Sequence, residues 1–341
     1  MLVLGLETSC DDTGAGIVDD TRAIRAHVVA SQLAEHKPYG GVVPEIAARA
    51  HLDVIDGVID AALREAGVTF ADLSGVAATT GPGLIGGVMV GAMAGKAIAA
   101  VRNLPFIAVN HLEAHALTAR LTEDVPFPHL LLLASGGHCQ LLLVRGVGDY
   151  ELLGRTIDDA VGECFDKCAK MLGLGYPGGP LVEQAARDGN AKAFDLPRPM
   201  VGREGCDFSF SGLKTAVRTA LEGRENTQAF VADMAASLQA AIADSIADRV
   251  RHAFAMLDER GENVTAFVTA GGVAANQVLR ARLMQIATEQ GAAFAAPPPK
   301  LCTDNGVMVA WAGLERLRLG LTDPLDTASR PRWPLEEIAK A

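Results

Sequence analysis

Residues 130–144 read LLLLASGGHCQLLLV, in which two apolar runs stand on either side of the short turn Ser135–His138. Short apolar runs bounded by paired glycines predict two buried strands joined as a hairpin. The start of the chain repeats this pattern, because the apolar runs at 2–6 and 14–19 flank the polar stretch ETSCDDT. The same local design therefore occurs twice, which indicates that the two halves of the chain are related.

A second repeated pattern follows each hairpin. Residues 266–269 form an apolar run that leads through AGGVAAN into the helix-like stretch 277–286. In the first half, residues 77–79 lead through GPG into the apolar stretch 84–102. The recurrence predicts an internal duplication with a period far too long for a solenoid. We expect two lobes that face each other across a cleft, where glycine turns let a nucleotide's phosphates and ribose approach the backbone.

This order of elements is similar to the actin, hexokinase and Hsp70 (ASKHA) ATPase architecture, an α/β fold. Residues 26–31 predict a further strand, and Pro44 opens a helix from Glu45 towards Ala66 that carries a structural His51. A helical insert is expected at about 155–260, between the second hairpin and the AGG turn. A long apolar helix within this insert, from about 225 to 258, fits either the core or a partner surface.

Composition favours a compact protein of a reducing compartment. The 341 residues carry a net charge of −11, and the six cysteines are scattered without a CxxC pair. This indicates a cytoplasmic protein and argues against a generally basic nucleic-acid surface. The start of the chain shows no secretory signal, and the glycine-rich stretch 84–101 favours a helix packed on a sheet over a membrane span. No membrane contact is expected.

The stretch His111-Leu-Glu-Ala-His115 places two histidines four residues apart. On a helix they share one face, so they are either two ligands of one metal ion or an ordinary helical pair. Asp304 precedes another apolar helix, and in isolation it is best explained as the N-cap of that helix. A metal site therefore needs a third ligand that the spacing alone does not identify.

Three other polar stretches have two interpretations each. Glu7, Asp11 and Asp12 in the first hairpin turn either contact a phosphate or its metal, or belong to a merely polar turn. The GYPGGP loop at 175–180 either holds a ribose or carbonyl against bare glycine backbone, or is a tight loop without a ligand. The basic and aromatic stretch RPRWP, with Arg330, Arg332 and Trp333, either touches RNA or packs back on the first lobe.

The whole chain resembles the TsaD family, the bacterial relatives of the archaeal and eukaryotic KEOPS catalytic subunit. The resemblance rests on eleven motifs in a fixed order: LGLETSCDDT, YGGVVPE, TTGPGL, NHLEAH, SGGH, GECFDK, YPGGP, DFSFSGLKT, AGGVAAN, CTDNG and RPRWP. It implies an ASKHA fold whose first lobe is 1–109 plus 322–341 and whose second lobe is 110–321. It also implies transfer of a threonylcarbamoyl group from threonylcarbamoyl-AMP to an adenosine beside the anticodon of tRNAs that read codons beginning with A.

The resemblance also assigns site residues. It implies metal ligands at His111, His115 and Asp304, with Fe(II) expected and Zn(II) as the alternative. For the adenylate it implies the set Leu133, Ala134, Ser135, Gly136, Gly137, Asp166, Gly179, Glu183 and Asn276. Asp11 and Asp12 are expected to assist proton removal or to organise water and metal. The implied partners are tRNA, a TsaB-type pseudo-enzyme paralogue and a TsaE-type P-loop ATPase, and the chain has no GxxxxGK[ST] motif of its own.

The chain departs from the family pattern at three positions. Ala114 replaces a common Gly, and because Ala is the stronger helix former the histidine pair should survive. Asp12 stands where Glu is common and is one methylene shorter. Leu133 stands where archaeal and eukaryotic relatives have a metal-contacting Tyr, so water or substrate is expected at that metal position.

Three rival functions remain at this stage. A metallopeptidase is disfavoured because Glu113 does not directly follow His111, as the base of HExxH would. A small-molecule kinase of the same fold would phosphorylate a sugar or carboxylate without tRNA. A scaffold that only senses nucleotide would keep its function without His115 or Asp304.

Overall fold

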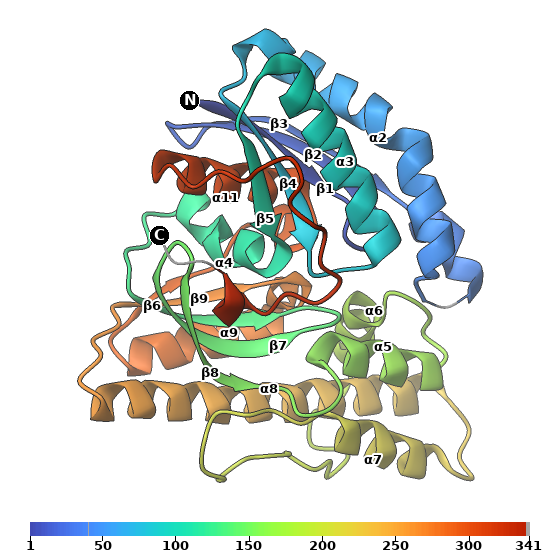
Figure 1. Ribbon diagram of the computed structural model, residues 1–341. Coiled ribbons are helices and arrows are strands. Elements are labelled where there is room, and N and C mark those ends of the chain that lie inside the picture. Colours follow the sequence, from blue (N-terminus) through green and yellow to red (C-terminus); the bar gives the residue numbers. More distant parts are fainter. Residues whose placement is uncertain (40, 339–341) are drawn as a thin grey trace. The chain divides into compact units, whose positions relative to one another are not determined.

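The computed structural model describes residues 1–39 and 41–338 and forms two compact units (Figure 1). Unit 1 comprises residues 1–124, 146–150 and the chain from Thr303 onward. Unit 2 comprises residues 125–145 and 151–302. Each unit contains its own five-stranded sheet.

The sheet of unit 1 has the strand order β3-β2-β1-β4-β5. Its strands are β1 (Leu2–Glu7), β2 (Asp12–Asp19), β3 (Ile24–Ser31), β4 (Gly75–Gly81) and β5 (Phe106–Asn110). The first three strands are antiparallel neighbours, whereas β4 and β5 run parallel to β1. The hairpin and the third strand predicted from the sequence are thereby confirmed.

Helices cover both faces of this first sheet. They are α1 (Leu33–His36), α2 (Pro44–Ala66), α3 (Ile85–Arg102), α4 (His111–Thr122) and α11 (Gly306–Arg318), with 3-10 turns at Lys37–Tyr39, Phe70–Asp72 and Leu335–Glu337. Alternation along β1 separates the faces: Leu4 and Leu6 enter the core beneath α2 and α3, whereas Gly5 faces α11.

Glycines in the sheet and in α11 let the main chain of the helix contact the main chain of the sheet directly. A Cβ at Gly5 would lie 2.1 Å from the nitrogen of Ala310, and one at Gly16 would lie 2.3 Å from the nitrogen of Val307. On the helix side, a Cβ at Gly306 would lie 2.3 Å from the nitrogen of Gly16. Only glycine fits at these positions, so they fix the place where α11 begins.

Helix α3 confirms the predicted close packing on a sheet. A Cβ at Gly91 would lie 2.5 Å from Thr8 Oγ1, and one at Gly95 would lie 3.1 Å from the Cβ of Ala78. Both α3 and α8 (Gln228–Glu259) are long and apolar enough for a membrane span, with 33% and 67% of their apolar windows buried. Such helices are weak evidence for a span, since core helices of soluble proteins share these properties.

The sheet of unit 2 has the strand order β10-β9-β6-β7-β8. Read from its other edge, β8-β7-β6-β9-β10, it corresponds strand for strand to β3-β2-β1-β4-β5 of the first sheet. Its strands are β6 (His129–Ala134), β7 (Cys139–Gly146), β8 (Asp149–Arg155), β9 (Ala266–Ala270) and β10 (Ala293–Ala295). The central strand β6 pairs antiparallel with β7 and parallel with β9, as β1 pairs with β2 and β4. The predicted duplication is therefore confirmed at the level of topology.

The helices of unit 2 include the predicted insert. They are α5 (Val161–Met171), α6 (Gly178–Ala186), α7 (Ser211–Leu221), α8, α9 (Gln277–Glu289) and α10 (Pro299–Cys302), with a 3-10 turn at Gly272–Ala275. Helix α8 connects the third strand of its sheet to the fourth, as α2 does in unit 1, so it belongs to the repeat. Cys164 and Cys168 lie in the same core cluster as most of the buried apolar residues of α8.

The boundaries of the compact units differ from those of the lobes expected from the sequence. The expected border at 109/110 falls at the last residue of β5, whereas unit 1 continues through α4 to Asp124. Helix α11, expected in the second lobe, also lies in unit 1. The physical reason is the close backbone contact of α11 with β1 and β2, which a sequence pattern does not reveal.

Candidate metal centre

Helix α4 begins where strand β5 ends, and this junction sets the position of the histidines. The side-chain oxygen of Asn110 accepts hydrogen bonds from the backbone nitrogens of Leu112 (2.8 Å) and Glu113 (3.4 Å). Asn110 is therefore the N-cap, and His111 occupies the first helical position. His115 follows one turn later on the same face, as the spacing predicts.

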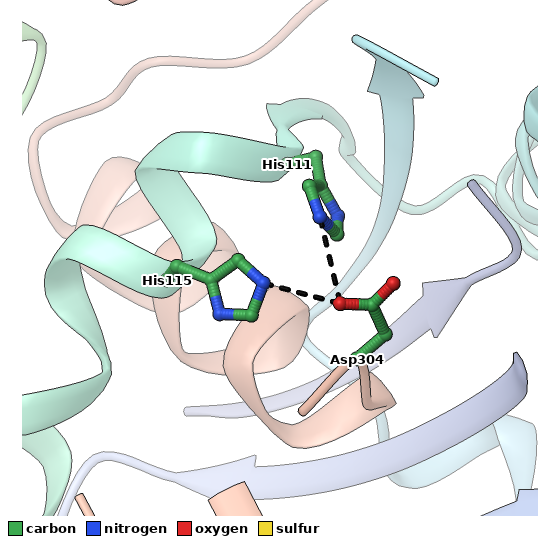
Figure 2. A group of neighbouring side chains, drawn as sticks. All are labelled: His111, His115 and Asp304. Carbon is green, nitrogen blue, oxygen red and sulfur yellow. Dashed lines mark hydrogen bonds and ion pairs between the residues drawn. The ribbon is translucent and has the colours of Figure 1, made fainter. Parts of the chain in front are cut away.

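Asp304 lies just before α11 but does not cap it. The N-cap is Asn305, whose side-chain oxygen accepts a hydrogen bond from the backbone nitrogen of Met308 at 2.9 Å. The capping role that the sequence suggested for Asp304 is therefore wrong by one residue. Its carboxylate instead faces the histidines, with Oδ1 at 3.2 Å from Nε2 of His115 and 3.6 Å from Nε2 of His111 (Figure 2).

Figure 2 shows the two imidazoles converging on the Asp304 carboxylate. The three ligand atoms lie within 4.8 Å of one another, and the imidazole rings are nearly perpendicular at 86°. His115 is 2% exposed in its side chain, whereas Asp304 is 24% exposed. Two imidazoles and one carboxylate form a donor set that is compatible with a divalent metal and leaves coordination positions open to a substrate.

Charges around the cluster change the protonation of His111. Burial alone would lower its pKa, but the carboxylates of Asp304 and Glu7 outweigh that effect and raise the pKa to about 9. Glu7 shows the complementary change, since His111 lowers its pKa against the opposing effect of burial. A divalent cation would replace the proton and balance the same carboxylates.

Glu7 also contacts His111 directly, because its Oε2 lies 3.0 Å from Nδ1. The sequence placed Glu7 in a polar turn between strands, but the structure places it at the end of β1 with no exposed surface. Sequence reasoning missed this contact with His111, since 104 residues separate the pair. A lone carboxylate at the end of an otherwise apolar strand was the available signal.

Asp12 lies at the start of β2, and the charge of Asp304 in the cluster affects its pKa. Burial raises its pKa to about 6; a hydrogen bond with Ser31 opposes this, and the charges of Asp304 and Asp11 add to it. Its Oδ1 is buried and has no hydrogen-bond partner among the described residues. Asp11 is half-buried, and the structure does not place either carboxylate among the three clustered ligands.

Glu113 points away from the histidine face, which weakens the peptidase interpretation further. Its carboxylate accepts hydrogen bonds from the hydroxyl of Tyr150 (3.0 Å) and the backbone nitrogen of Gly148 (3.1 Å), and pairs with Arg316 at 3.2 Å. All of these groups are buried. Glu113 therefore joins α4 to α11 and is engaged in structure, so it is not poised as a general base at the histidines.

His51 and the main chain of the RPRWP stretch both make contacts within unit 1. His51 is fully buried and bonded to Thr13 at 2.7 Å, as expected of a structural histidine. The main chain of Arg330 donates to the Thr80 carbonyl at 2.7 Å, and the Trp333 carbonyl accepts from the Asn110 side chain at 2.8 Å. The stretch thus packs back on unit 1, as one alternative predicted. Contact with RNA stays a prediction, and the Arg330 side chain stacks on Trp333 with its residue exposed.

In unit 2, the residues implied for the adenylate are joined by a chain of contacts around the turn after β6. The Ser135 carbonyl accepts from the nitrogen of Gly162 at the start of α5 at 3.3 Å. Asp166 then accepts from the nitrogen of Gly178 at 2.7 Å, at the start of α6. A Cβ at Gly271, in the AGG turn, would lie 2.4 Å from the Ala134 carbonyl oxygen. The turn and the starts of two helices therefore meet.

The same region continues to α9. Glu183 accepts from the nitrogen of Gln277 at 2.9 Å, and Asn276 caps α9 through Val278 and Leu279. Gly136, Gly137 and Gly179 are open, since a Cβ at each would meet nothing within 4 Å. The structure thus gathers these predicted residues in one region of unit 2 and leaves bare backbone exposed at its surface.

Comparison with known proteins gives a consistent result. Residues 23–311 match the family model "TsaD: tRNA N6-adenosine threonylcarbamoyltransferase". Curated proteins of that name are 61% identical over 342 residues in Paramagnetospirillum magneticum (100% of this chain, 99% of the relative) and 59% identical over 345 residues in Rhodospirillum rubrum (99% and 95%).

Among solved structures, the chain is similar to T. kodakarensis HypF, with a TM-score of 0.61 at 18% identity over 94% of this chain and 48% of that one. It is also similar to the Acidaminococcus fermentans (R)-2-hydroxyglutaryl-CoA dehydratase component A, with a TM-score of 0.53 at 16% identity over 93% and 99%. Together with the duplicated sheets, these similarities show the ASKHA fold that the sequence predicted.

Proposed function

Because the chain belongs to the TsaD family of tRNA N6-adenosine threonylcarbamoyltransferases, we propose that it carries out this transfer with a divalent metal at His111, His115 and Asp304. The donor is threonylcarbamoyl-AMP, and the acceptor is the exocyclic amine of the adenosine 3′-adjacent to the anticodon in tRNAs that read codons beginning with A. A new bond forms between that nitrogen and the carbamoyl carbon. The bond from this carbon to the AMP phosphate oxygen breaks, and AMP leaves.

The convergence of three ligands on one point is the observation that carries this proposal. His111 and His115 come from one helix, and Asp304 comes from the segment just before another. A metal at this position supplies Lewis-acid polarisation of the transferred carbonyl when it is bound. We propose Fe(II) as this metal, with Zn(II) as the alternative, because both accept imidazole together with carboxylate ligands.

The open glycines of unit 2 support its assignment to the adenylate. Backbone without side chains at Gly136, Gly137 and Gly179 allows phosphate and ribose oxygens to reach backbone N–H groups. The start of α6 at Gly178 adds the positive end of a helix dipole. We assign the set implied by the family resemblance to this role, from Leu133 to Gly137 together with Asp166, Gly179, Glu183 and Asn276.

Proton removal from the exocyclic amine requires an acceptor. Asp12 has a buried oxygen without a partner among the described residues and a pKa of about 6, so it is largely ionised at neutral pH. We assign general-base work to Asp12, with Asp11 as a neighbouring charge that raises its basicity. The carbonyl carbon is attacked by a weak nucleophile, so positioning of the tRNA base carries much of the remaining barrier.

Partners follow from the surface and the charge. A net charge of −11 disfavours unassisted binding of tRNA, and the exposed Arg330 and Arg332 are the local cations we assign to its backbone.

Ile85, Met89 and Met93 form an exposed apolar stripe on α3, with exposed fractions of 43%, 51% and 59%. Such a stripe supports a protein partner, and we assign it to a TsaB-type paralogue. A TsaE-type ATPase completes the proposed assembly, which we place in the cytoplasm.

Reconstitution tests the proposal directly. The chain is combined with threonylcarbamoyl-AMP, a tRNA that reads codons beginning with A, Fe(II) or Zn(II), and the two partner proteins. Modified adenosine is measured by mass spectrometry of nucleosides, and a tRNA with another base at the acceptor position serves as the control. Modified nucleoside should appear only with the first tRNA, and its absence with either metal and both partners would refute the transferase assignment.

A further inference from the structure

Glu7 forms a buried hydrogen-bonding centre immediately behind one of the metal ligands. Its Oε1 accepts a hydrogen bond from the backbone nitrogen of Ser9 at 2.6 Å. Its Oε2 accepts from the Thr79 hydroxyl at 2.6 Å and lies 3.0 Å from Nδ1 of His111. These contacts come from the hairpin turn, from β4 and from α4, so three separate elements meet at one fully buried carboxylate.

The chemistry of this contact determines which nitrogen of His111 is available. An ionised carboxylate only accepts hydrogen bonds, so the Nδ1 that faces Glu7 must carry the hydrogen and donate it. In the neutral imidazole, Nε2 is then the nitrogen with the lone pair. Nε2 is also the nitrogen that faces Asp304, at 3.6 Å from its Oδ1. The contact with Glu7 therefore directs the ligand atom of His111 towards the other two ligands.

His115 has no equivalent support. Its Nε2 faces Asp304, but its Nδ1 is buried and has no hydrogen-bond partner among the described residues. The Nδ1 side of the His111 ring is thus held by Glu7 from β1 and by the Ser9 hydroxyl oxygen at 3.1 Å, whereas the Nδ1 side of His115 has no such contact among the described residues. His111 is the ligand whose orientation is fixed independently of its own helix.

We propose that Glu7 is a positioning residue of the metal centre, which holds His111 in the tautomer and orientation that present Nε2 to the metal. A carboxylate behind a metal-bound histidine orients the ring and increases the basicity of its ligand nitrogen, and its loss lowers metal affinity about 10- to 100-fold. This inference rests on the proposed metal site. It assigns Glu7 a function that neither hairpin geometry nor sheet packing requires.

The test compares two substitutions at the same hydrogen-bonding centre. Glu7→Gln keeps the size of the side chain but removes the negative charge. Because one carboxylate oxygen becomes an NH2 group, the variant cannot accept hydrogen bonds from Ser9, Thr79 and His111 at once. Thr79→Val removes one hydrogen bond to Glu7 and leaves the carboxylate in contact with His111. Zn(II) affinity is measured in competition with a chromophoric chelator, and thermal unfolding of the metal-free proteins is followed in parallel.

We expect Glu7→Gln to weaken Zn(II) binding about 10- to 100-fold and Thr79→Val to change it by less than about threefold. Equal affinities of the wild type and Glu7→Gln would show that Glu7 is only structural. Equal losses of affinity in both variants would show the same. Failure of the wild type to bind Zn(II) or Fe(II) would instead refute the metal site itself, so the two inferences fail separately.

A measurement on the wild type keeps the proposal testable if Glu7→Gln does not fold. Histidine-selective ¹⁵N NMR of the Zn(II)-loaded protein identifies the protonated nitrogen of His111, with His111→Ala used for assignment. The expected spectrum has the proton on Nδ1. A proton on Nε2 would show that Glu7 does not set the tautomer and would overturn the proposal.

Discussion

The two hairpin turns occupy equivalent places in the duplicated sheets, but they carry opposite chemistry. The turn between β1 and β2 is rich in carboxylates, with Glu7 and Asp12 at its two ends and Asp11 between them. The turn between β6 and β7 is Ser-Gly-Gly-His and leaves Gly136 and Gly137 without neighbours within 4 Å of a Cβ. One scaffold thus presents side chains suited to a cation and, in its second copy, bare backbone suited to an anion.

The supporting structure differs in the same way. In unit 1, two ion pairs join α4 to α11: Arg316 pairs with Glu113 in the interior, and the half-buried Arg120 pairs with Glu315. In unit 2, hydrogen bonds from the starts of α6 and α9 to Asp166 and Glu183 join the elements. Side chains that converge on one atom must be held by neighbouring groups, because a small displacement changes their mutual geometry.

Removal of a metal ligand should give the largest loss of activity. Its effect on ligand binding should be confined to the metal site of unit 1. His115→Ala or Asp304→Ala is expected to reduce tRNA modification by at least about 1000-fold, because one-third of the ligand set is lost. Metal content falls in parallel, while AMP binding measured by calorimetry stays within about twofold. His252→Ala, in unit 2, serves as the control. Normal function of Asp304→Ala in cells would favour a scaffold over an enzyme.

Asp12→Asn should separate activity from stability. As a general base Asp12 is expected to contribute about 100-fold to the rate, and the wild-type rate should rise with pH through about 6. Because its folded pKa of about 6 exceeds the ordinary 3.8, the folded state binds the proton more tightly. The free energy of unfolding of the metal-free protein should therefore fall as pH rises from 4 to 6.

Asp12→Asn removes this pH-dependent cost of ionisation, so the variant should be more stable than the wild type above pH 6. Thermal unfolding between pH 4 and 8 measures the difference, and single-turnover rates over the same range measure the role in catalysis. Unchanged rates would exclude Asp12 as the base. A constant difference in melting temperature at all pH values would contradict the raised pKa.

Gly136→Ala should affect the anion side of the comparison without damage to the fold. A Cβ at this position meets no protein atom within 4 Å, so the melting temperature is expected to change by less than about 2 °C. The methyl group would occupy space assigned to the adenylate, and AMP affinity should fall about tenfold. Calorimetry measures the AMP affinity of the wild type and of Gly136→Ala. Gly146→Ala is the control, because a Cβ at Gly146 would also meet no atom within 4 Å. Unchanged affinity would place the adenylate elsewhere.

Neutralisation of the RPRWP arginines should give the smallest effect. The double variant Arg330→Ala and Arg332→Ala is expected to weaken tRNA binding several-fold and to lower the dependence of log K on log salt by about 1.5. Metal and AMP affinities should not change. Binding is measured by filter retention from 50 to 200 mM salt, with Arg64→Ala as an exposed control. An unchanged salt dependence would mean that these arginines do not contact tRNA and contribute only to packing.

Much of the fold could be predicted from the sequence because its signals are local. Apolar runs and glycine turns identified both hairpins, and their repetition identified the duplication. The limits of the compact units could not be predicted. They depend on α11, whose contact with Gly5 and Gly16 is made far from these residues in the chain.

The metal site shows the same division between local and distant information. The spacing of His111 and His115 is local and indicated a pair, but Asp304 was assigned through the family resemblance. Its own neighbourhood suggested a helix cap, and only the structure shows that Asn305 performs that task. The support from Glu7 depends on the pairing of strands and on the position where α4 begins, so no pattern of neighbouring residues could predict it.

The glycine contact between α11 and the first sheet has a consequence for how this enzyme can change. Gly5, Gly16 and Gly306 meet at backbone distance, and Asp304 stands only two residues before this contact. The separation between the carboxylate and the sheet is therefore set by main-chain atoms and cannot be adjusted in small steps by larger or smaller side chains. Changes in the properties of the candidate metal site should therefore arise from side chains that touch its ligands, such as Glu7 beside His111, and directed evolution of the enzyme towards a new acyl donor should begin there.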